Sequence, residues 1–191
     1  MKIKFIFAII ILGLTCKQEN KAFLWRGNVN LPLAYKGSSA DAETPPVFNM
    51  QSVSKDKKIL ILNFFAPDCP PCIEELPDLK AYYNEYKSKY NDVEFRVVGS
   101  LLSSVAGEDD GNKELISAEL LKFINKHNIS YPVYLATKKD LDEFNITGYP
   151  ETFIFFRDKN KEWYLKRKYI SAIKKSDLEK YSKNYEYQSS Y

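Results

Sequence analysis

The feature that most constrains the fold is a junction between an apolar run and a helix, where two cysteines lie close together. Residues 59–66 read ILILNFFA, which is typical of a strand covered on both faces. Cys69-Pro-Pro-Cys72 follows three residues later. Beyond it, apolar side chains recur every three or four residues, which indicates a helix: Leu76, Leu79, Tyr83, Tyr86 and Tyr90. The sequence therefore predicts a buried strand that leads into a helix with Cys69 at its start.

The rest of the chain alternates predicted strands with predicted helices. Strands are expected at 93–102 and 131–136, and two more within 152–170 around a turn at 158–160. Helices are expected at 114–128, at 138–145 and from a Ser176 cap to about residue 184. This order predicts an α/β fold, a central mixed β-sheet flanked by helices on both faces. A chain of 191 residues is long enough to build that domain once.

The N-terminus begins MKIKFIFAIIILGLTC, with two lysines before an apolar run at 5–14. As a helix this run spans about 15 Å, half of a hydrocarbon core, so it predicts a signal peptide and not a membrane-spanning helix. Cys16 resembles the acylated cysteine of bacterial lipoproteins, although Gly13 and Thr15 depart from the residues preferred there. Cleaved soluble secretion and an uncleaved anchor are the alternatives.

Export limits what the three cysteines can do, because exported thiols meet an oxidising compartment. If Cys16 carries lipid, Cys69 and Cys72 remain and can pair only with each other. At a helix N-terminus, free N–H groups and the helix dipole stabilise a thiolate, which is the reactive form of cysteine. We therefore expect Cys69 to be an exposed nucleophile. Cys72, one turn further along, is expected to be a more buried thiol that resolves the mixed disulfide.

Other uses of a Cys-x-x-Cys pair fit these residues less well. A structural disulfide across so short a loop would constrain the unfolded chain very little. A zinc site needs two further ligands, for which only Cys16 and His127 remain. Haem attachment needs a histidine directly after the second cysteine, where Ile73 stands. The sequence therefore predicts no metal and no cofactor.

The segment NFFAPDCPPCIEELPDL at 63–79 resembles the active-site segment of the thioredoxin superfamily. It is most similar to the extracytoplasmic branch that includes the TlpA, ResA and CcmG (DsbE) proteins. Pro77 matches the kink proline of the family's active-site helix, and Glu75 matches a glutamate near its cysteines. NITGYPETFIFF, about 80 residues later, resembles the segment that bears the family's cis-proline, which would be Pro150.

The resemblance covers roughly residues 45–184 and implies a thioredoxin-like domain at 45–185. The expected organisation adds a signal peptide at 1–15, an acylated N-terminus and tether at 16–44, and a C-terminal tail at 186–191. The resemblance also implies that Glu75 handles the proton in catalysis. A cis Tyr149-Pro150 bond would turn the backbone of Tyr149 toward the cysteines, where it could pair with an extended substrate.

Two residues depart from the family pattern. Asp68 stands where the family usually has tryptophan, and a carboxylate about 6 Å from a sulfur costs a thiolate roughly 0.7 kcal/mol. The helix terminus offers about 0.3–1 kcal/mol in the other direction, so Cys69 is expected to be only modestly acidified and the dithiol to be a reductant. Asn63 stands where thioredoxin has a buried aspartate, so a proton relay would use Glu75 or water. A surface salt bridge is the alternative role for Glu75.

The remaining charged groups carry weaker predictions. His127, the only histidine, is expected near a helix C-terminus, where a positive charge interacts favourably with the dipole. The basic run at 166–168 is expected to be a solvated strand edge. The net charge of +3 is too small to argue for a nucleic-acid partner.

These observations predict an exported thiol–disulfide oxidoreductase that reduces disulfides, lipid-anchored at Cys16 in the periplasm or on the outer face of the cell membrane. The resemblance implies re-reduction by a membrane electron-donor thiol protein. It also implies disulfide-containing exported proteins as substrates, apocytochrome c among them. The alternatives are a general disulfide reductase or isomerase, a copper-binding chaperone using Cys69, Cys72 and His127, and a non-catalytic binding lipoprotein.

Overall fold

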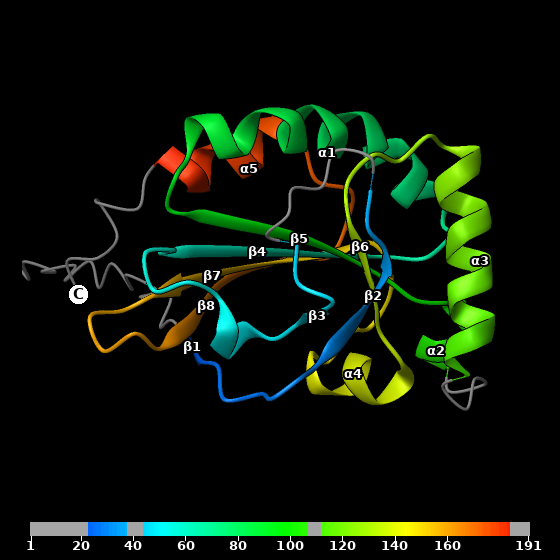
Figure 1. Cartoon of the computed structure of the whole chain (residues 1–191), viewed down its shortest axis with the longest axis horizontal. Helices are drawn as coiled ribbons and strands as arrows, with labels where there is room; N and C mark the ends of the chain where they lie inside the picture. The colour runs from blue at the N-terminus through cyan, green and yellow to red at the C-terminus, as the bar shows by residue number, and fades with distance from the viewer. Residues whose placement is uncertain (1–22, 38–43, 107–111, 184–191) are drawn as a thin grey trace, which may run out of the picture.

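The computed structural model of the chain describes residues 23–37, 44–106 and 112–183 (Figure 1). Its strands are β1 Phe23–Leu24, β2 Leu31–Tyr35, β3 Val47–Phe48, β4 Ile59–Phe65, β5 Val93–Gly99, β6 Val133–Leu135, β7 Glu151–Arg157 and β8 Trp163–Tyr169. Its helices are α1 Pro70–Lys89, α2 Leu102–Ala106, α3 Lys113–Lys126, α4 Lys138–Glu143, α5 Lys175–Lys183 and the short 3-10 helix η1 Met50–Ser52.

The strands form one mixed sheet in the order β1-β8-β7-β4-β5-β6-β2-β3. β4 lies in its interior, parallel to β5 and antiparallel to β7, and every side chain of β4 is buried, as its apolar sequence predicts. Phe64 near the end of β4 pairs with Glu151, the first residue of β7. The carboxyl end of β4, from which the chain continues to Cys69, therefore lies beside Pro150.

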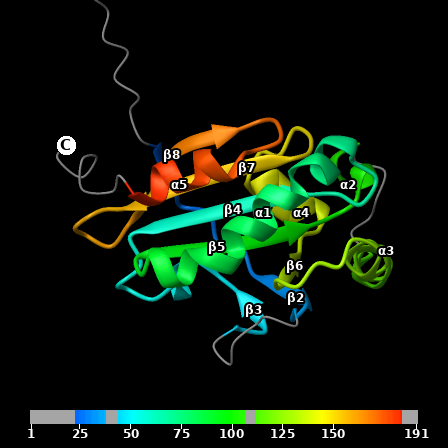
Figure 2. The same ribbon diagram turned by 90° about the horizontal axis from the view of Figure 1, so that it is seen from above.

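Two apolar layers cover the two faces of the sheet. α1, α3 and α5 pack on one face, through core residues that include Leu79, Leu120 and Leu178. α4 and the N-terminal segment pack on the other face, through Leu141 and Trp25. Figure 1 shows α1 and α5 above the sheet and α4 below it, and Figure 2 shows α1 lying over β4 and β5. The predicted mixed sheet with helices on both faces is confirmed.

The strands and helices predicted after residue 59 are present, with some of their ends shifted. The strand predicted at 93–102 ends at Gly99, and α2 begins at Leu102. The last helix begins at Lys175, and its first turn is capped from another helix and not by Ser176. The Lys175 N–H donates to Asp78 Oδ1 of α1 at 2.9 Å, which satisfies a donor that the helix itself leaves free.

The predicted tether at 16–44 was expected to hold one short strand at most, but two strands of the sheet, β1 and β2, lie within residues 23–37. β1 pairs antiparallel with β8, and β2 pairs antiparallel with β6 on the far side of the sheet. Between these strands the ring of Trp25 stacks on Phe144, with ring centroids 4.6 Å apart. Such contacts with distant residues hold the segment in place and leave no periodicity in the local sequence. The folded unit therefore includes residues that the sequence analysis assigned to the tether.

The predicted signal peptide, Cys16 and the predicted tail at 186–191 lie outside the described residues. Among the helices that the structure describes, none has both the length and the hydropathy needed to cross a bilayer. The organisation expected for the two ends of the chain stays a prediction.

Candidate active site

Cys69 and Cys72 lie where β4 leads into α1, and they form a disulfide with Cα atoms 5.2 Å apart. Cys69 is the N-cap residue of α1. Pro70 and Pro71 occupy the first helical positions, where their missing N–H groups cost no helical hydrogen bond. The Cys72 N–H donates to Cys69 Sγ at 3.2 Å. This hydrogen bond and the helix dipole both favour a thiolate on Cys69 when the disulfide is open.

The two cysteines are less accessible than expected. Only 3% of Cys69 and 1% of Cys72 is exposed, so the expectation of an exposed nucleophile is wrong for the disulfide form. As the N-cap residue, Cys69 turns its sulfur back over the first helical turn, toward the Cys72 N–H, instead of toward solvent. Asp68, Pro70, Pro71 and Ile73 are exposed around the pair.

Glu75 lies on the inward side of α1, one turn beyond Cys72, and is fully buried. Its Oε1 accepts a hydrogen bond from Asn63 Nδ2 of β4 at 2.9 Å. Its Oε2 accepts a hydrogen bond from the backbone N–H of Ile173, in the loop between β8 and α5, also at 2.9 Å. The alternative that Glu75 is a surface salt-bridge residue is therefore wrong.

The surroundings of Glu75 favour its protonated form. Burial raises the pKa of this carboxyl to about 7, because the charged form loses its hydration. The hydrogen bonds from Ile173 and Asn63 act in the opposite direction, since they stabilise the ionised form, and the nearby charge of Asp78 raises the pKa further. A carboxyl with a pKa near 7 gives and takes protons readily at neutral pH.

Asn63 is a site residue to which the sequence analysis gave no positive role. Its amide is buried in the middle of β4 and donates to Glu75 Oε1 and, at 3.0 Å, to Thr152 Oγ1. Thr152 is its register partner on β7, so the adjacent strands hold the amide in place. The available signal was a single polar residue inside the apolar run at 59–66. A buried polar group needs partners, and here those partners fix the orientation of the Glu75 carboxyl.

The peptide bond between Tyr149 and Pro150 is cis, as the resemblance implied. Pro150 is buried directly before β7, and the pairing of β7 with β4 places it at the edge of the sheet from which the chain leads to the cysteines. Tyr149 packs against both apolar layers. The cis bond and the disulfide therefore lie at the same edge of the sheet.

His127 caps the C-terminal end of α3, as expected, but its surroundings disfavour the charge that was expected there. Burial of the ring and the charges of Lys126 and Lys80 lower its pKa below the usual value. Lys80 Nζ donates to the His127 backbone carbonyl, and Lys80 lies about 12 Å beyond Cys72 along α1. His127 therefore does not join the two cysteines in a copper site. Within the described part of the chain, no group of three His, Cys, Asp or Glu side chains is placed to hold a metal.

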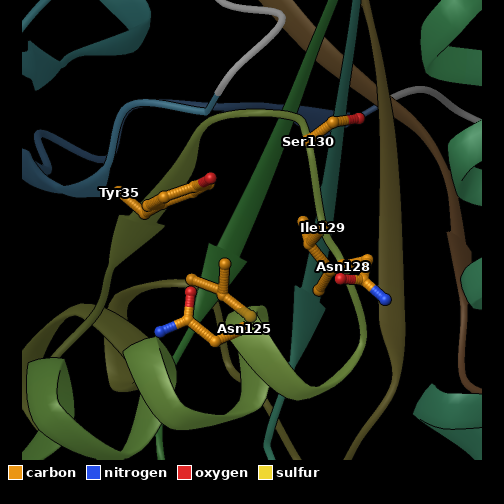
Figure 3. Close-up of a pocket in the computed structure, with 6 residues that line it drawn as sticks. Tyr35, Asn125, Asn128, Ile129 and Ser130 are labelled. Carbon is orange, nitrogen blue, oxygen red and sulfur yellow. The ribbon is translucent and has the colours of Figure 1, made fainter.

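A small pocket lies between β2 and the loop after α3, and neither Cys69 nor Cys72 lines it (Figure 3). It has a volume of about 220 Å³ and is lined by Tyr35, Ile124, Asn125, Asn128, Ile129 and Ser130. The amides of Asn125 and Asn128 point in opposite directions, so the lining does not present converging polar groups. We assign this pocket no part in the candidate active site.

The fold and the site together place this chain in the class of thioredoxin-like thiol–disulfide oxidoreductases. A dithiol that opens and closes at a helix N-terminus, beside a cis-proline, is the chemistry that this class uses. Within that class the chain belongs to the Redoxin family, whose model matches residues 34–180.

Two curated relatives come from Bacillus subtilis (strain 168). Sporulation thiol-disulfide oxidoreductase A is 26% identical over 132 residues, which cover 64% of this chain and 72% of the relative. The thioredoxin-like protein YneN is 22% identical over 122 residues, which cover 60% of this chain and 64% of YneN, a little under two thirds of its length. The crystal structure of StoA from Bacillus subtilis has the same fold, with a TM-score of 0.56 at 20% identity, covering 82% of this chain and 97% of StoA.

Proposed function

We propose that this protein is an exported, membrane-anchored thiol–disulfide oxidoreductase that works as a disulfide reductase. Cys69 is its nucleophile and Cys72 its resolving thiol. The observation that carries the proposal is the Cys69 sulfur at the N-cap of α1, one to two helical turns from the buried Glu75 carboxyl. The N-cap position of the helix activates the attacking Cys69 sulfur, and the Glu75 carboxyl exchanges the proton of the resolving Cys72 thiol.

The reaction transfers two electrons in two exchange steps. The Cys69 thiolate attacks one sulfur of the substrate disulfide, the substrate S–S bond breaks, and the second substrate sulfur leaves as a thiolate that takes a proton from solvent. Cys72 then passes its proton to the Glu75 carboxylate and attacks the Cys69 sulfur. The bond to the substrate breaks, the substrate thiolate leaves and is protonated, and the Cys69–Cys72 disulfide of this structure is formed.

The substrate binds to the backbone next to the cis Tyr149-Pro150 bond. Tyr149 lies just before β7 begins, and an extended segment of substrate pairs with its backbone N–H and carbonyl as a strand does. Pro150 next to it presents a ring with no N–H donor and no metal-binding atom to the sulfurs. Tyr149 and Pro150 therefore select for a polypeptide that reaches the disulfide in an extended form.

A membrane electron-donor thiol protein completes the cycle by reducing the Cys69–Cys72 disulfide again. The substrates are disulfide-containing exported proteins, with apocytochrome c as the specific candidate. The segment GYPETF at 148–153 is similar to the form of the cis-proline segment found in cytochrome-c-maturation members of the family, and this similarity supports that candidate. Deleting the gene tests it, because loss of covalent haem attachment in the deletion strain points to apocytochrome c. Intact haem attachment points to a general reductase or isomerase.

The direction of the reaction has its own test. Because the Asp68 charge offsets the helix terminus, the reduction potential is expected to be more negative than about −200 mV, on the reducing side of the range between thioredoxin and DsbA. Equilibration of the purified protein with glutathione redox buffers, followed by thiol alkylation and mass spectrometry, measures it. Asp68→Asn, which removes the charge, is expected to make the potential less negative. A potential near −120 mV for the native protein would instead make it an oxidant.

The anchor is tested separately. Cys16→Ala is expected to move the protein from the membrane fraction to the soluble exported fraction, since the acylated side chain is removed. Immunoblots of fractionated cells measure the distribution, with Cys69→Ala as the control that keeps the lipid attachment site. Membrane retention of Cys16→Ala would contradict the lipid anchor and favour an uncleaved signal segment.

A further inference from the structure

The basic run at 166–168 is not uniformly a solvated strand edge, because Lys168 is partly buried against a buried carboxylate. Lys168 Nζ on β8 lies 2.8 Å from Glu151 Oε2 at the start of β7, with side-chain exposures of 20% and 0%. The same amine donates to the backbone carbonyl of Asn145 at 2.7 Å. The expectation from the sequence is therefore wrong for Lys168, whose position in the run gave no sign of this contact.

Glu151 holds the same loop through its other oxygen. Its Oε1 accepts hydrogen bonds from the Thr147 backbone N–H at 3.0 Å and from the Thr147 hydroxyl at 2.6 Å. The loop at 145–150 is thus tied at two points, Asn145 through Lys168 and Thr147 through Glu151. This loop ends in the cis Tyr149-Pro150 bond.

The loop has further anchors on both sides of Thr147: the Asn145 and Ile146 N–H groups donate to backbone carbonyls of α4, and the side chain of Tyr149 packs against both apolar layers. Asn145 has a φ of 50°, in the left-handed region, and a Cβ placed on Gly148 would meet nothing within 4 Å. At Thr147 and Gly148, between these anchors, the hydrogen bonds from Thr147 to Glu151 are the side-chain contacts that hold the backbone leading to Tyr149. A buried carboxylate stays in place only when it is paired, so the Glu151 tie depends in turn on the Lys168 amine.

We propose that Glu151 and Lys168 are positioning residues that hold loop 145–150 so that the Tyr149 backbone is aligned to pair with an extended polypeptide substrate. This inference rests on the proposed function. Small disulfides have no extended backbone that could pair with Tyr149. Their reduction therefore depends less on the position of the Tyr149 backbone than the reduction of polypeptide disulfides does. The Glu151–Lys168 pair thus sets the preference of the enzyme for polypeptide disulfides.

The test compares two substrates and two lysines of the same strand. In Lys168→Met, kcat/KM for insulin reduction is expected to fall about tenfold more than kcat/KM for hydroxyethyl disulfide, with most of the loss in KM. Lys166→Met, the matched control, is expected to show no such split between the substrates. Lys168→Arg keeps the charge and is expected to restore insulin reduction, at least in part. Equal losses on both substrates, or no loss on either, would overturn the proposal.

A second readout does not depend on activity. Amide hydrogen exchange at Thr147, measured by NMR, is expected to be about tenfold faster in Lys168→Met than in the native protein or in Lys166→Met, because the tie to Glu151 is loosened. The double variant Glu151→Gln with Lys168→Met leaves no unpaired buried charge. If Lys168→Met does not fold, the exchange is measured in this double variant instead. Unchanged exchange in these variants would overturn the positioning role. Failure of the native protein to reduce either disulfide would instead refute the proposed function.

Discussion

Cys72→Ser is expected to leave a substrate covalently bound to Cys69, and Cys69→Ser is expected to lower turnover on the order of a thousandfold or more. The first substitution removes the thiol that expels the product, so the mixed disulfide accumulates. The second removes the only sulfur at the helix N-cap. Non-reducing gel electrophoresis of exported proteins, followed by mass spectrometry, detects the mixed disulfide and identifies its partner.

The control for this trap is the reversed variant. Cys69→Ser leaves Cys72, whose sulfur lies inside the first turn and is the less exposed of the two, so it is expected to capture little or nothing. The double variant gives the background of the gel. Equal trapping by Cys69→Ser and Cys72→Ser would contradict the assigned roles, because the buried thiol would then be an equally good nucleophile.

Glu75→Gln is expected to remove a pH dependence of about 3 kcal/mol from the free energy of unfolding. The folded protein raises the pKa of Glu75 from 4.5 to about 7, so between these values the native state holds more protons than the unfolded state. The stability linked to this group is therefore fully present below pH 4.5 and is lost as the pH rises through 7. Above pH 7 the native protein carries a buried charge that the glutamine variant lacks.

Urea unfolding of both proteins between pH 4 and pH 8, with the disulfide intact, measures this difference. The native protein is expected to lose stability relative to Glu75→Gln as the pH rises from 4.5 to 7, and the difference is expected to level off above pH 7. Glu74→Gln removes an exposed carboxyl from the same helix and serves as the control. A constant difference between native protein and Glu75→Gln across this pH range would show that Glu75 does not titrate as its surroundings require.

The central part of the fold was predictable because its signals are local. The run at 59–66 shows a strand buried on both faces, and the periodic side chains that follow show the inward face of α1. β1 and β2 gave no such signal. β1 has two residues, and its segment is held by contacts such as Trp25 on Phe144, which are more than a hundred residues apart in the chain. Tertiary contacts of this kind decide the structure of edge segments and do not appear in a local pattern.

The reactive residues of the site could be predicted from the sequence more completely than their surroundings. The spacing of Cys69 and Cys72 identified them as site residues, and the motif around Pro150 identified the proline. The burial of Glu75 was not readable, because one of its partners is the backbone N–H of Ile173, 98 residues away along the chain. Lys168 was not readable either, since a lysine in a basic strand looks the same whether it meets water or a buried carboxylate.

If Cys16 is acylated, as proposed, the start of the folded domain at β1 limits the distance between the domain and the membrane surface. A tether from Cys16 to residue 45 would allow a reach of about 100 Å, whereas the chain from Cys16 to β1 spans at most about 25 Å when fully extended. The catalytic domain then stays within roughly its own diameter of the bilayer. Its electron donor and its substrates must then come to the membrane, and encounters in the plane of the bilayer replace free diffusion.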